Sequence, residues 1–181
     1  MNLKALVCFI VITVAAVSAV ETLWDYQLLN HQNEVVPLSQ YKNSKALLIV
    51  NVASNCGFTY TNYRELEELH EKYSDAGLIV IAVPCNQFGF QEPSSNDEIQ
   101  TFTQNYGVTF PVMKKADVNG PGALDLFKFL KDQTGQVEIN WNFNKFLVTN
   151  DGKDVKRYVA NVNPSKIEDD LLSYLGIEEE L

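Results

Sequence analysis

Residues 46–59 read ALLIVNVASNCGFT and join a fully apolar stretch to a single cysteine and the start of an amphipathic helix. An apolar run without polar alternation is typical of a buried strand. The thiolate is the reactive form of cysteine, and the positive end of a helix dipole favours that anion. The stretch therefore predicts a strand–helix unit that presents Cys56 as a reactive thiol.

Further apolar runs and helical patterns follow this unit in alternation. In the first half of the chain, we predict a hairpin of 24–29 with 34–36, a strand at 46–53, a helix from 61 or 62 to 74 and a strand at 78–83. A capping box at 95–98 opens a helix at 96–106, and a further helix follows at 123–133. The chain closes with a hairpin of 143–149 with 155–159 and a last helix that is capped at 165–168 and ends near 175. Strands that alternate with helices indicate a parallel sheet covered on both faces, to which the closing hairpin adds antiparallel strands. We predict an α/β, thioredoxin-like fold with a central mixed sheet flanked by helices and an N-terminal β-hairpin.

Two cysteines follow the two apolar strands, Cys56 after residues 46–53 and Cys85 after residues 78–83. Functional sites in such sheets lie at the carboxyl ends of the strands, where both thiols fall. Adjacent strands are about 4.8 Å apart, so a Cys56–Cys85 disulfide is conceivable if the loops yield. A structural disulfide and a buried, inert Cys85 are the alternatives.

The first residues have the pattern of a secretory signal peptide. Lys4 precedes an apolar run at 5–17, and Val17-Ser18-Ala19 places small residues at the spacing of a cleavage site. The run is shorter than the roughly 20 residues of a spanning helix, which favours cleavage over a retained membrane anchor. We predict a signal peptide at 1–19, one domain at 20–181, no membrane span after cleavage, and a place in the secretory pathway.

The acidic charge balance excludes several classes of partner. The chain has 14 Lys and Arg against 23 Asp and Glu, a net charge of −9, and its only arginines are Arg64 and Arg157. Nucleic acids and anionic lipids are bound through clustered cationic side chains, so neither is an expected partner. The scarcity of arginine also argues mildly against a small polyanionic substrate such as glutathione.

Three segments resemble the glutathione peroxidase family: 51–59 (NVASNCGFT), 84–93 (PCNQFGFQEP) and 141–148 (WNFNKFLV). The resemblance runs from about residue 24 to 175 in the same order and spacing. It implies a thioredoxin fold, the reduction of hydroperoxides, and no bound cofactor or metal. It also implies a catalytic tetrad, which falls on Cys56, Gln91, Trp141 and Asn142.

The chemistry of these side chains agrees with that role. The Gln91 and Asn142 amides and the Trp141 indole are neutral N–H donors, which favour a thiolate and steady a developing alkoxide. His31 and His70 are the only histidines, and neither is well placed to act as a base toward Cys56. Without the resemblance, a core aromatic and two polar loop residues would explain the three donors equally well.

The chain departs from parts of the family at two positions. Many members carry selenocysteine where this chain has Cys56, so we expect slower turnover. Two-cysteine members carry a resolving cysteine where this chain has Thr103. Cleavage of the signal peptide would remove Cys8, which leaves Cys85 as the candidate resolving cysteine. The short span from 123 to 141 resembles compact monomeric members, whose open site admits bulky hydroperoxides or a protein thiol.

The signal peptide, the pair of cysteines and the compact length resemble the monomeric endoplasmic-reticulum branch, the vertebrate seventh and eighth members. That resemblance implies reduction by a protein dithiol such as a protein disulfide isomerase, and the tetrad with the scarcity of arginine makes glutathione the second candidate. The ending Glu178-Glu179-Glu180-Leu181 partly matches a retrieval signal, so retention and secretion both stay open.

We hypothesise a thiol peroxidase that acts in the response to oxidative stress. A disulfide exchanger is disfavoured because Thr59 stands where its partner cysteine would be. A peroxide sensor or redox-linked binding protein without turnover is the alternative from another class.

Overall fold

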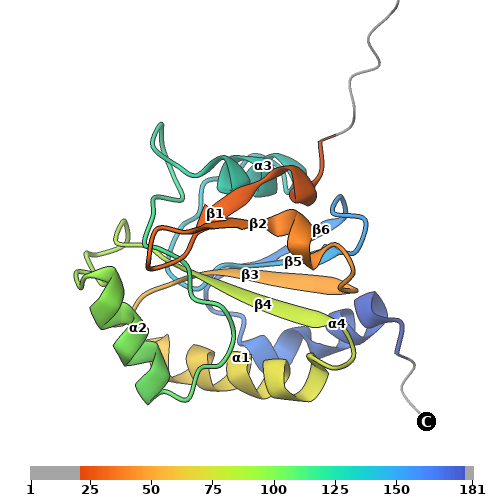
Figure 1. Cartoon of the computed structure of the whole chain (residues 1–181), viewed down its shortest axis with the longest axis horizontal. Helices are drawn as coiled ribbons and strands as arrows, with labels where there is room; N and C mark the ends of the chain where they lie inside the picture. The colour runs from red at the N-terminus through yellow and green to blue at the C-terminus, as the bar shows by residue number, and fades with distance from the viewer. Residues whose placement is uncertain (1–20, 178–181) are drawn as a thin grey trace, which may run out of the picture.

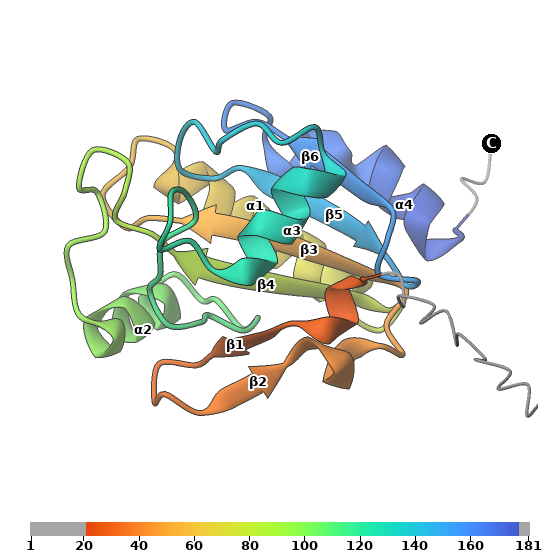
Figure 2. The same cartoon turned by 90° about the horizontal axis from the view of Figure 1, so that it is seen from above.

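The computed structural model describes residues 21–177, in which a central sheet lies between two layers of helices (Figures 1 and 2). The predicted signal peptide at 1–19 and the acidic ending at 178–181 lie outside the described residues. No helix between residues 21 and 177 combines the length and apolar character needed to cross a membrane.

Six strands, four α-helices and three short 3-10 helices make up the described chain. They are η1 (Leu23–Asp25), β1 (Gln27–Leu29), β2 (Val35–Pro37), η2 (Leu38–Tyr41), β3 (Ala46–Val52), α1 (Thr59–Tyr73), β4 (Leu78–Pro84), α2 (Asn96–Asn105), α3 (Asp125–Gln133), β5 (Lys145–Thr149), β6 (Val155–Tyr158), η3 (Pro164–Ile167) and α4 (Glu168–Leu175).

The main sheet is mixed, in the order β4-β3-β5-β6. Strands β3 and β4 run parallel, whereas β5 is antiparallel to both β3 and β6. The hairpin β1-β2 forms a separate two-stranded sheet, tied on through a bridge between Asn30 and Met113. The predicted thioredoxin-like α/β fold, with its N-terminal hairpin, is confirmed.

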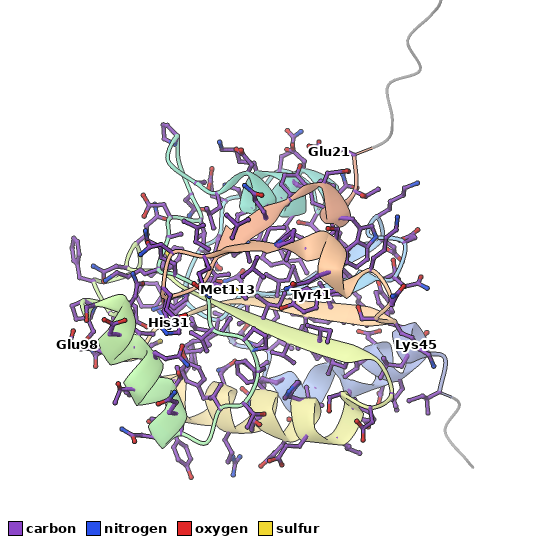
Figure 3. All side chains as sticks on the ribbon, viewed as in Figure 1. Glu21, His31, Tyr41, Lys45, Glu98 and Met113 are labelled. Carbon is purple, nitrogen blue, oxygen red and sulfur yellow. The ribbon has the colours of Figure 1, made fainter. Side chains whose placement is uncertain are left out.

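The sheet divides the core into two clusters, and side chains fill the space between the layers (Figure 3). Because successive strand residues face opposite sides, Leu48 and Val50 pack under α1 and α4, while Leu47 and Ile49 pack toward α3 and the hairpin. All seven residues of β3 are buried, as its unbroken apolar run predicts.

Several element boundaries differ from the sequence-based expectation. The strand expected from residue 24 begins only at Gln27, because Leu23–Asp25 form a 3-10 turn. Helix α1 begins at Thr59, two or three residues earlier than expected. The Thr59 hydroxyl donates to the Ala53 carbonyl at 2.7 Å and accepts the Cys56 N–H at 3.1 Å, which satisfies backbone groups at this start.

The two predicted capping boxes have different outcomes. The box at the start of α2 is confirmed: Ser95 Oγ accepts the Glu98 N–H at 3.3 Å, and Glu98 Oε2 accepts the Ser95 N–H at 2.7 Å. The box predicted at 165–168 is wrong, because the chain makes the 3-10 turn η3 there and the Ser165 N–H donates to Glu65 Oε2 at 2.9 Å. The Ser165 N–H is therefore satisfied by a side chain of α1 and not by a local cap.

Candidate functional site

Cys56 lies in the loop between β3 and α1, at the carboxyl edge of the sheet. Its carbonyl accepts the Thr59 N–H at 3.0 Å, which places the residue at the entrance of α1. The residue is 9% exposed, so most of its surface is buried. Within residues 21–177, no hydrogen bond is made to the Cys56 Sγ.

The loop after β4 brings Gln91 against the cysteine loop. The Asn55 N–H donates to the Gln91 carbonyl at 2.9 Å, so the residue before Cys56 is bonded directly to Gln91. The loop turns through two consecutive left-handed residues, Gly89 (φ +62°) and Phe90 (φ +53°). A Cβ added at Gly89 would lie 3.5 Å from both Gln91 Nε2 and Trp141 Cη2, so the backbone of Gly89 closely approaches both side chains.

Trp141 and Asn142 come from the segment that precedes β5. Asn142 is fully buried and its Nδ2 donates to Gln91 Oε1 at 2.9 Å. Trp141 is 37% exposed, with its ring centroid 6.3 Å from that of Phe88. The structure therefore brings Gln91, Trp141 and Asn142 together beside the loop of Cys56.

Asn51 is a further site residue that the sequence analysis missed. It is fully buried near the end of β3, where its Nδ2 donates to the Trp141 carbonyl at 3.1 Å. Its Oδ1 accepts the Asn144 N–H at 2.9 Å, and its backbone carbonyl accepts the Phe143 N–H. Asn51 therefore fixes the segment that carries Trp141 and Asn142. A lone polar residue inside an apolar strand is the signal that would have revealed it.

Glu92 is the second residue that was missed. It is fully buried next to Gln91, and its Oε2 accepts the Ser54 hydroxyl at 3.1 Å. Burial raises the pKa of the Glu92 carboxyl, which the bond from Ser54 and the charge of Lys115 only partly offset. Its Oε1 has no hydrogen-bond partner in the described part of the chain. The Glu92 carboxyl therefore links the loop of Gln91 to the loop of Cys56 through its bond to Ser54.

Cys85 lies on the other side of the sheet from Cys56. Cys56 packs in the cluster under α1, whereas Cys85 is fully buried in the cluster that faces α3. Both thiols are free. Burial raises the pKa of the Cys85 thiol, which donates to Gln87 Oε1 at 3.6 Å. The structure does not bring the candidate resolving cysteine together with the other predicted site residues.

The two histidines lie in other parts of the fold. His31 lies in the turn between β1 and β2, and His70 lies near the end of α1, in edge contact with Phe110. Within residues 21–177, no group of three or more His, Cys, Asp or Glu side chains is arranged to hold a metal ion.

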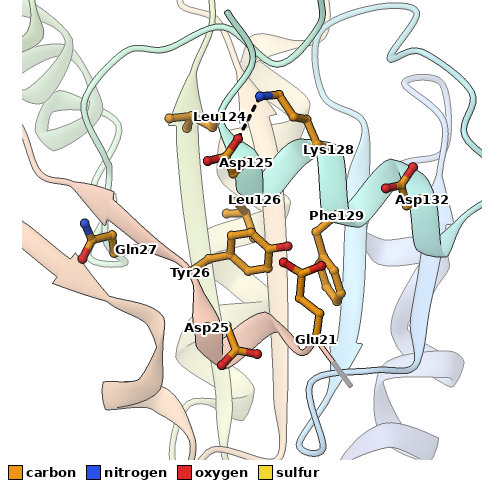
Figure 4. Close-up of a pocket in the computed structure, with 10 residues that line it drawn as sticks. All are labelled: Glu21, Asp25, Tyr26, Gln27, Leu124, Asp125, Leu126, Lys128, Phe129 and Asp132. Carbon is orange, nitrogen blue, oxygen red and sulfur yellow. Dashed lines mark hydrogen bonds and ion pairs between the residues drawn. The ribbon is translucent and has the colours of Figure 1, made fainter. Parts of the chain in front are cut away.

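A cavity of about 820 Å³ lies between the start of the hairpin and α3, and the neighbouring rings of Tyr26 and Phe129 are among the side chains that line it (Figure 4). Lys128 at its edge pairs with Asp125 at 2.8 Å. None of the candidate site residues lines this cavity.

Comparison with known proteins gives one consistent result. A family model described as glutathione peroxidase matches residues 23–131. A glutathione peroxidase-like peroxiredoxin 2 of Saccharomyces cerevisiae is 46% identical over 160 residues, which cover 86% of this chain and 98% of the yeast protein. A probable phospholipid hydroperoxide glutathione peroxidase of Helianthus annuus is 51% identical over 146 residues, covering 78% and 81% of the two chains.

Solved structures agree with the sequence relatives. The crystal structure of T. cruzi GPX1 superposes with a TM-score of 0.71 at 34% identity, covering 88% of this chain and all of that one. A thiol:disulfide interchange protein of Chlorobium tepidum superposes with a TM-score of 0.63 at 13% identity, a likeness that shows the shared fold alone.

Proposed function

Because this chain belongs to the glutathione peroxidase family, we propose that Cys56 is the thiol with which it attacks hydroperoxides. The enzyme is a thiol peroxidase that reduces hydroperoxides, phospholipid hydroperoxides included. Peroxidases of this cysteine-based type use a thiol reductant as co-substrate and need no bound cofactor.

The proposed step is a displacement at oxygen. The Cys56 thiolate attacks the terminal peroxide oxygen, an S–O bond forms and the O–O bond breaks. The departing alkoxide takes up the proton that the thiol released and leaves as an alcohol or water. Cys56 remains as a sulfenic acid, which a thiol must then reduce.

Gln91, Trp141 and Asn142 are proposed to supply donors to the thiolate and to the leaving oxygen. The observation that carries this proposal is the 2.9 Å bond from Asn142 Nδ2 to Gln91 Oε1. Because that bond occupies the carbonyl of Gln91, the Nε2 of the same amide is left as the donor, beside Trp141 and next to the loop of Cys56. Neutral donors set in place before the reaction stabilise developing negative charge without reorganisation.

The reductant is proposed to come from another molecule. Thr103, at the position of the resolving cysteine in two-cysteine members, is buried in α2 with its hydroxyl on the Gln100 carbonyl. Cys85 is enclosed on the far face of the sheet. A protein dithiol, such as that of a protein disulfide isomerase, is the preferred reductant, and glutathione is second because few arginines are present.

A secretory location and a monomeric state complete the proposal. The location is supported by the signal-peptide pattern at 1–19, and the monomer by the short segment between α3 and β5. The sequence relatives reported above are a yeast and a sunflower protein, so assignment to the endoplasmic-reticulum branch rests on the signal pattern, the presence of Cys56 and Cys85 and the compact length.

The test compares Cys56→Ser with the matched variant Cys85→Ser. Stopped-flow measurement should show that Cys56→Ser loses peroxide consumption down to the rate of buffer alone, because serine is a far weaker nucleophile. Cys85→Ser should retain the rate of the unaltered protein. Unchanged consumption by Cys56→Ser would overturn the proposal. If peroxide oxidises Cys56 of the unaltered protein once, and neither a protein dithiol nor glutathione supports further peroxide consumption, the protein is a sensor instead.

A further inference from the structure

Lys145 is a fully buried lysine that the proposed mechanism does not use. It lies at the start of β5, opposite Val50 of β3 and Tyr158 of β6. Lysine is almost never fully buried unless a partner compensates it. Its Nζ donates to the carbonyl of Phe143, two residues earlier, at 2.8 Å.

The partner of Lys145 is a residue with an unusual backbone. Phe143 has φ +63°, a left-handed conformation that is an outlier for a bulky side chain. Its N–H donates to the Asn51 carbonyl at 2.6 Å, and its carbonyl accepts from Lys145. Its ring is fully buried, edge-on to Tyr63 of α1 at 5.9 Å between centroids. Both backbone polar groups and the ring are therefore held, and Lys145 supplies one of these three restraints.

The turn at Phe143 sets the direction of the site residues before it. Asn142 directly precedes Phe143 and reaches Gln91, while Trp141 is held through its carbonyl by Asn51. If Phe143 relaxed toward an extended conformation, the strand pattern would continue backward and Asn142 would turn away from Gln91. Left-handed residues that surrounding contacts enforce are typical of functional sites.

We propose that Lys145 is a positioning residue of the peroxidase site, whose bond to the Phe143 carbonyl holds the left-handed turn that presents Trp141 and Asn142 to Gln91. This inference rests on the proposed function of those residues. Lys145 acts through the backbone and does not touch the substrate.

The charges around Lys145 make this restraint sensitive to pH. Glu65 of α1 favours the ammonium form, while its own oxygens are shared with the Ser165 N–H and, at 3.6 Å, with Arg64. On β6, the Tyr158 hydroxyl is bonded to Asp170 of α4, which also pairs with Lys156. Burial outweighs the attraction of Glu65 and lowers the pKa of Lys145 to about 7.

The sign of the effect follows from the two forms of the amine. Below the pKa, the ammonium makes a charge-assisted bond to the Phe143 carbonyl, and such bonds are shorter and stronger than neutral ones. Above the pKa, the neutral amine donates more weakly. We therefore expect the turn to loosen, and the site to lose order, as the pH rises through about 7.

The experiment uses Lys145→Met, which removes the donor, and Lys145→Gln, which keeps an uncharged donor. Both are made with Trp24→Phe, so that Trp141 is the single tryptophan and its fluorescence reports on the site. Lys45→Met is the matched control, because the Lys45 Nζ also donates to a backbone carbonyl, that of Leu175 at 3.0 Å, at the opposite end of β3.

Lys145→Met should slow oxidation of Cys56 by peroxide about tenfold or more, because small misplacements of catalytic groups cost this much or more. In the reduced protein, Trp141 fluorescence should titrate with a midpoint near 7 and lose that transition in Lys145→Met and Lys145→Gln, but not in Lys45→Met. Lys145→Gln should recover part of the rate that Lys145→Met loses, because the amide still donates a hydrogen bond.

A Trp141 titration that persists unchanged in both Lys145 variants would overturn the inference, as would a folded Lys145→Met protein with the unaltered rate. If Lys145→Met does not fold, Lys145→Gln decides by the same criteria. Because the fluorescence titration needs no peroxide, it tests the positioning role even if the test of Cys56 fails.

Discussion

At the scale of single residues, the site depends on buried polar side chains that connect separate segments. Asn51 bonds the end of β3 to the segment 141–144 through both its amide atoms. Glu92 bonds the loop of Gln91 to Ser54 in the loop of Cys56. A buried hydrogen-bonding group that loses its partner costs more than the bond itself is worth, so each of these residues constrains its neighbours strongly.

Asn51→Ala should lower the free energy of unfolding by about 1–3 kcal/mol, because it leaves the Trp141 carbonyl and the Asn144 N–H with fewer partners in a buried site. Urea denaturation followed by circular dichroism measures this change. The exposed Asn161→Ala is the control and should stay within about 0.5 kcal/mol of the unaltered protein. An Asn51→Ala protein as stable as that control would contradict the structural role.

Glu92→Gln should change how stability depends on pH. The pKa of Glu92 is raised above its ordinary value of 4.5 in the folded state, so the folded protein binds this proton more tightly than the unfolded chain does. This contribution to stability is present below 4.5 and is lost as the pH rises through the folded-state pKa. The glutamine variant has no such proton, so its stability relative to the unaltered protein should increase from acidic to neutral pH. Urea denaturation at several pH values measures it, and a constant difference would refute the expectation.

At the scale of elements, the ends of strands and the starts of helices position the site residues. Helix α1 begins close after Cys56 because Thr59 satisfies backbone groups on both sides of the turn. Helix α2, which holds Thr103, depends on the capping box of Ser95 and Glu98. The last helix, α4, lacks a side-chain cap and ends at Gly176 with φ +68°. Local capping therefore specifies α2 more strongly than α4.

Ser95→Ala should destabilise the protein by about 1 kcal/mol, because it removes the hydroxyl that accepts the Glu98 N–H. The neighbouring Ser94→Ala is the matched control, since Ser94 contributes its backbone carbonyl to Lys115 and keeps it in the variant. Thermal or urea unfolding of the two variants compares them directly. Equal effects of the two substitutions would show that the capping box contributes nothing.

At the scale of the whole molecule, the sheet separates the two thiols. Cys56 faces the α1 layer at the edge of the sheet, whereas Cys85 is enclosed between the sheet and the α3 layer. A disulfide between them would require the Cα atoms to approach within about 6.8 Å with side chains that face each other. The arrangement therefore favours reduction of Cys56 by a separate molecule.

Treatment with one equivalent of peroxide should leave no Cys56–Cys85 disulfide, because the intact sheet keeps the side chains apart. Peptide mapping by mass spectrometry should find Cys56 as a sulfenic acid or as a mixed disulfide with an added thiol, and Cys85 as an unmodified thiol. In urea, an alkylating agent should label both cysteines of the untreated protein, but only Cys85 of the peroxide-treated protein. A Cys56–Cys85 disulfide formed in the native protein would show instead that the loops yield and that Cys85 resolves the intermediate.

Local patterns along the chain were sufficient for the order of elements, the two buried strands and the edge of the sheet at which Cys56 lies. These features depend on periodicity and on turn residues that are close in sequence. The placement of Gln91, Trp141 and Asn142 near that edge came from the family resemblance, because their separation along the chain gives no local signal.

Tertiary structure alone decided which groups meet across the core. The roles of Asn51, Glu92 and Lys145, the left-handed turn at Phe143 and the opposite faces of the two cysteines all depend on contacts between distant segments. Whether a buried amide, carboxyl or amine is satisfied depends on which partner the fold brings to it. A polar residue within an apolar run shows that some partner must exist, and only the assembled sheet and loops show which one it is.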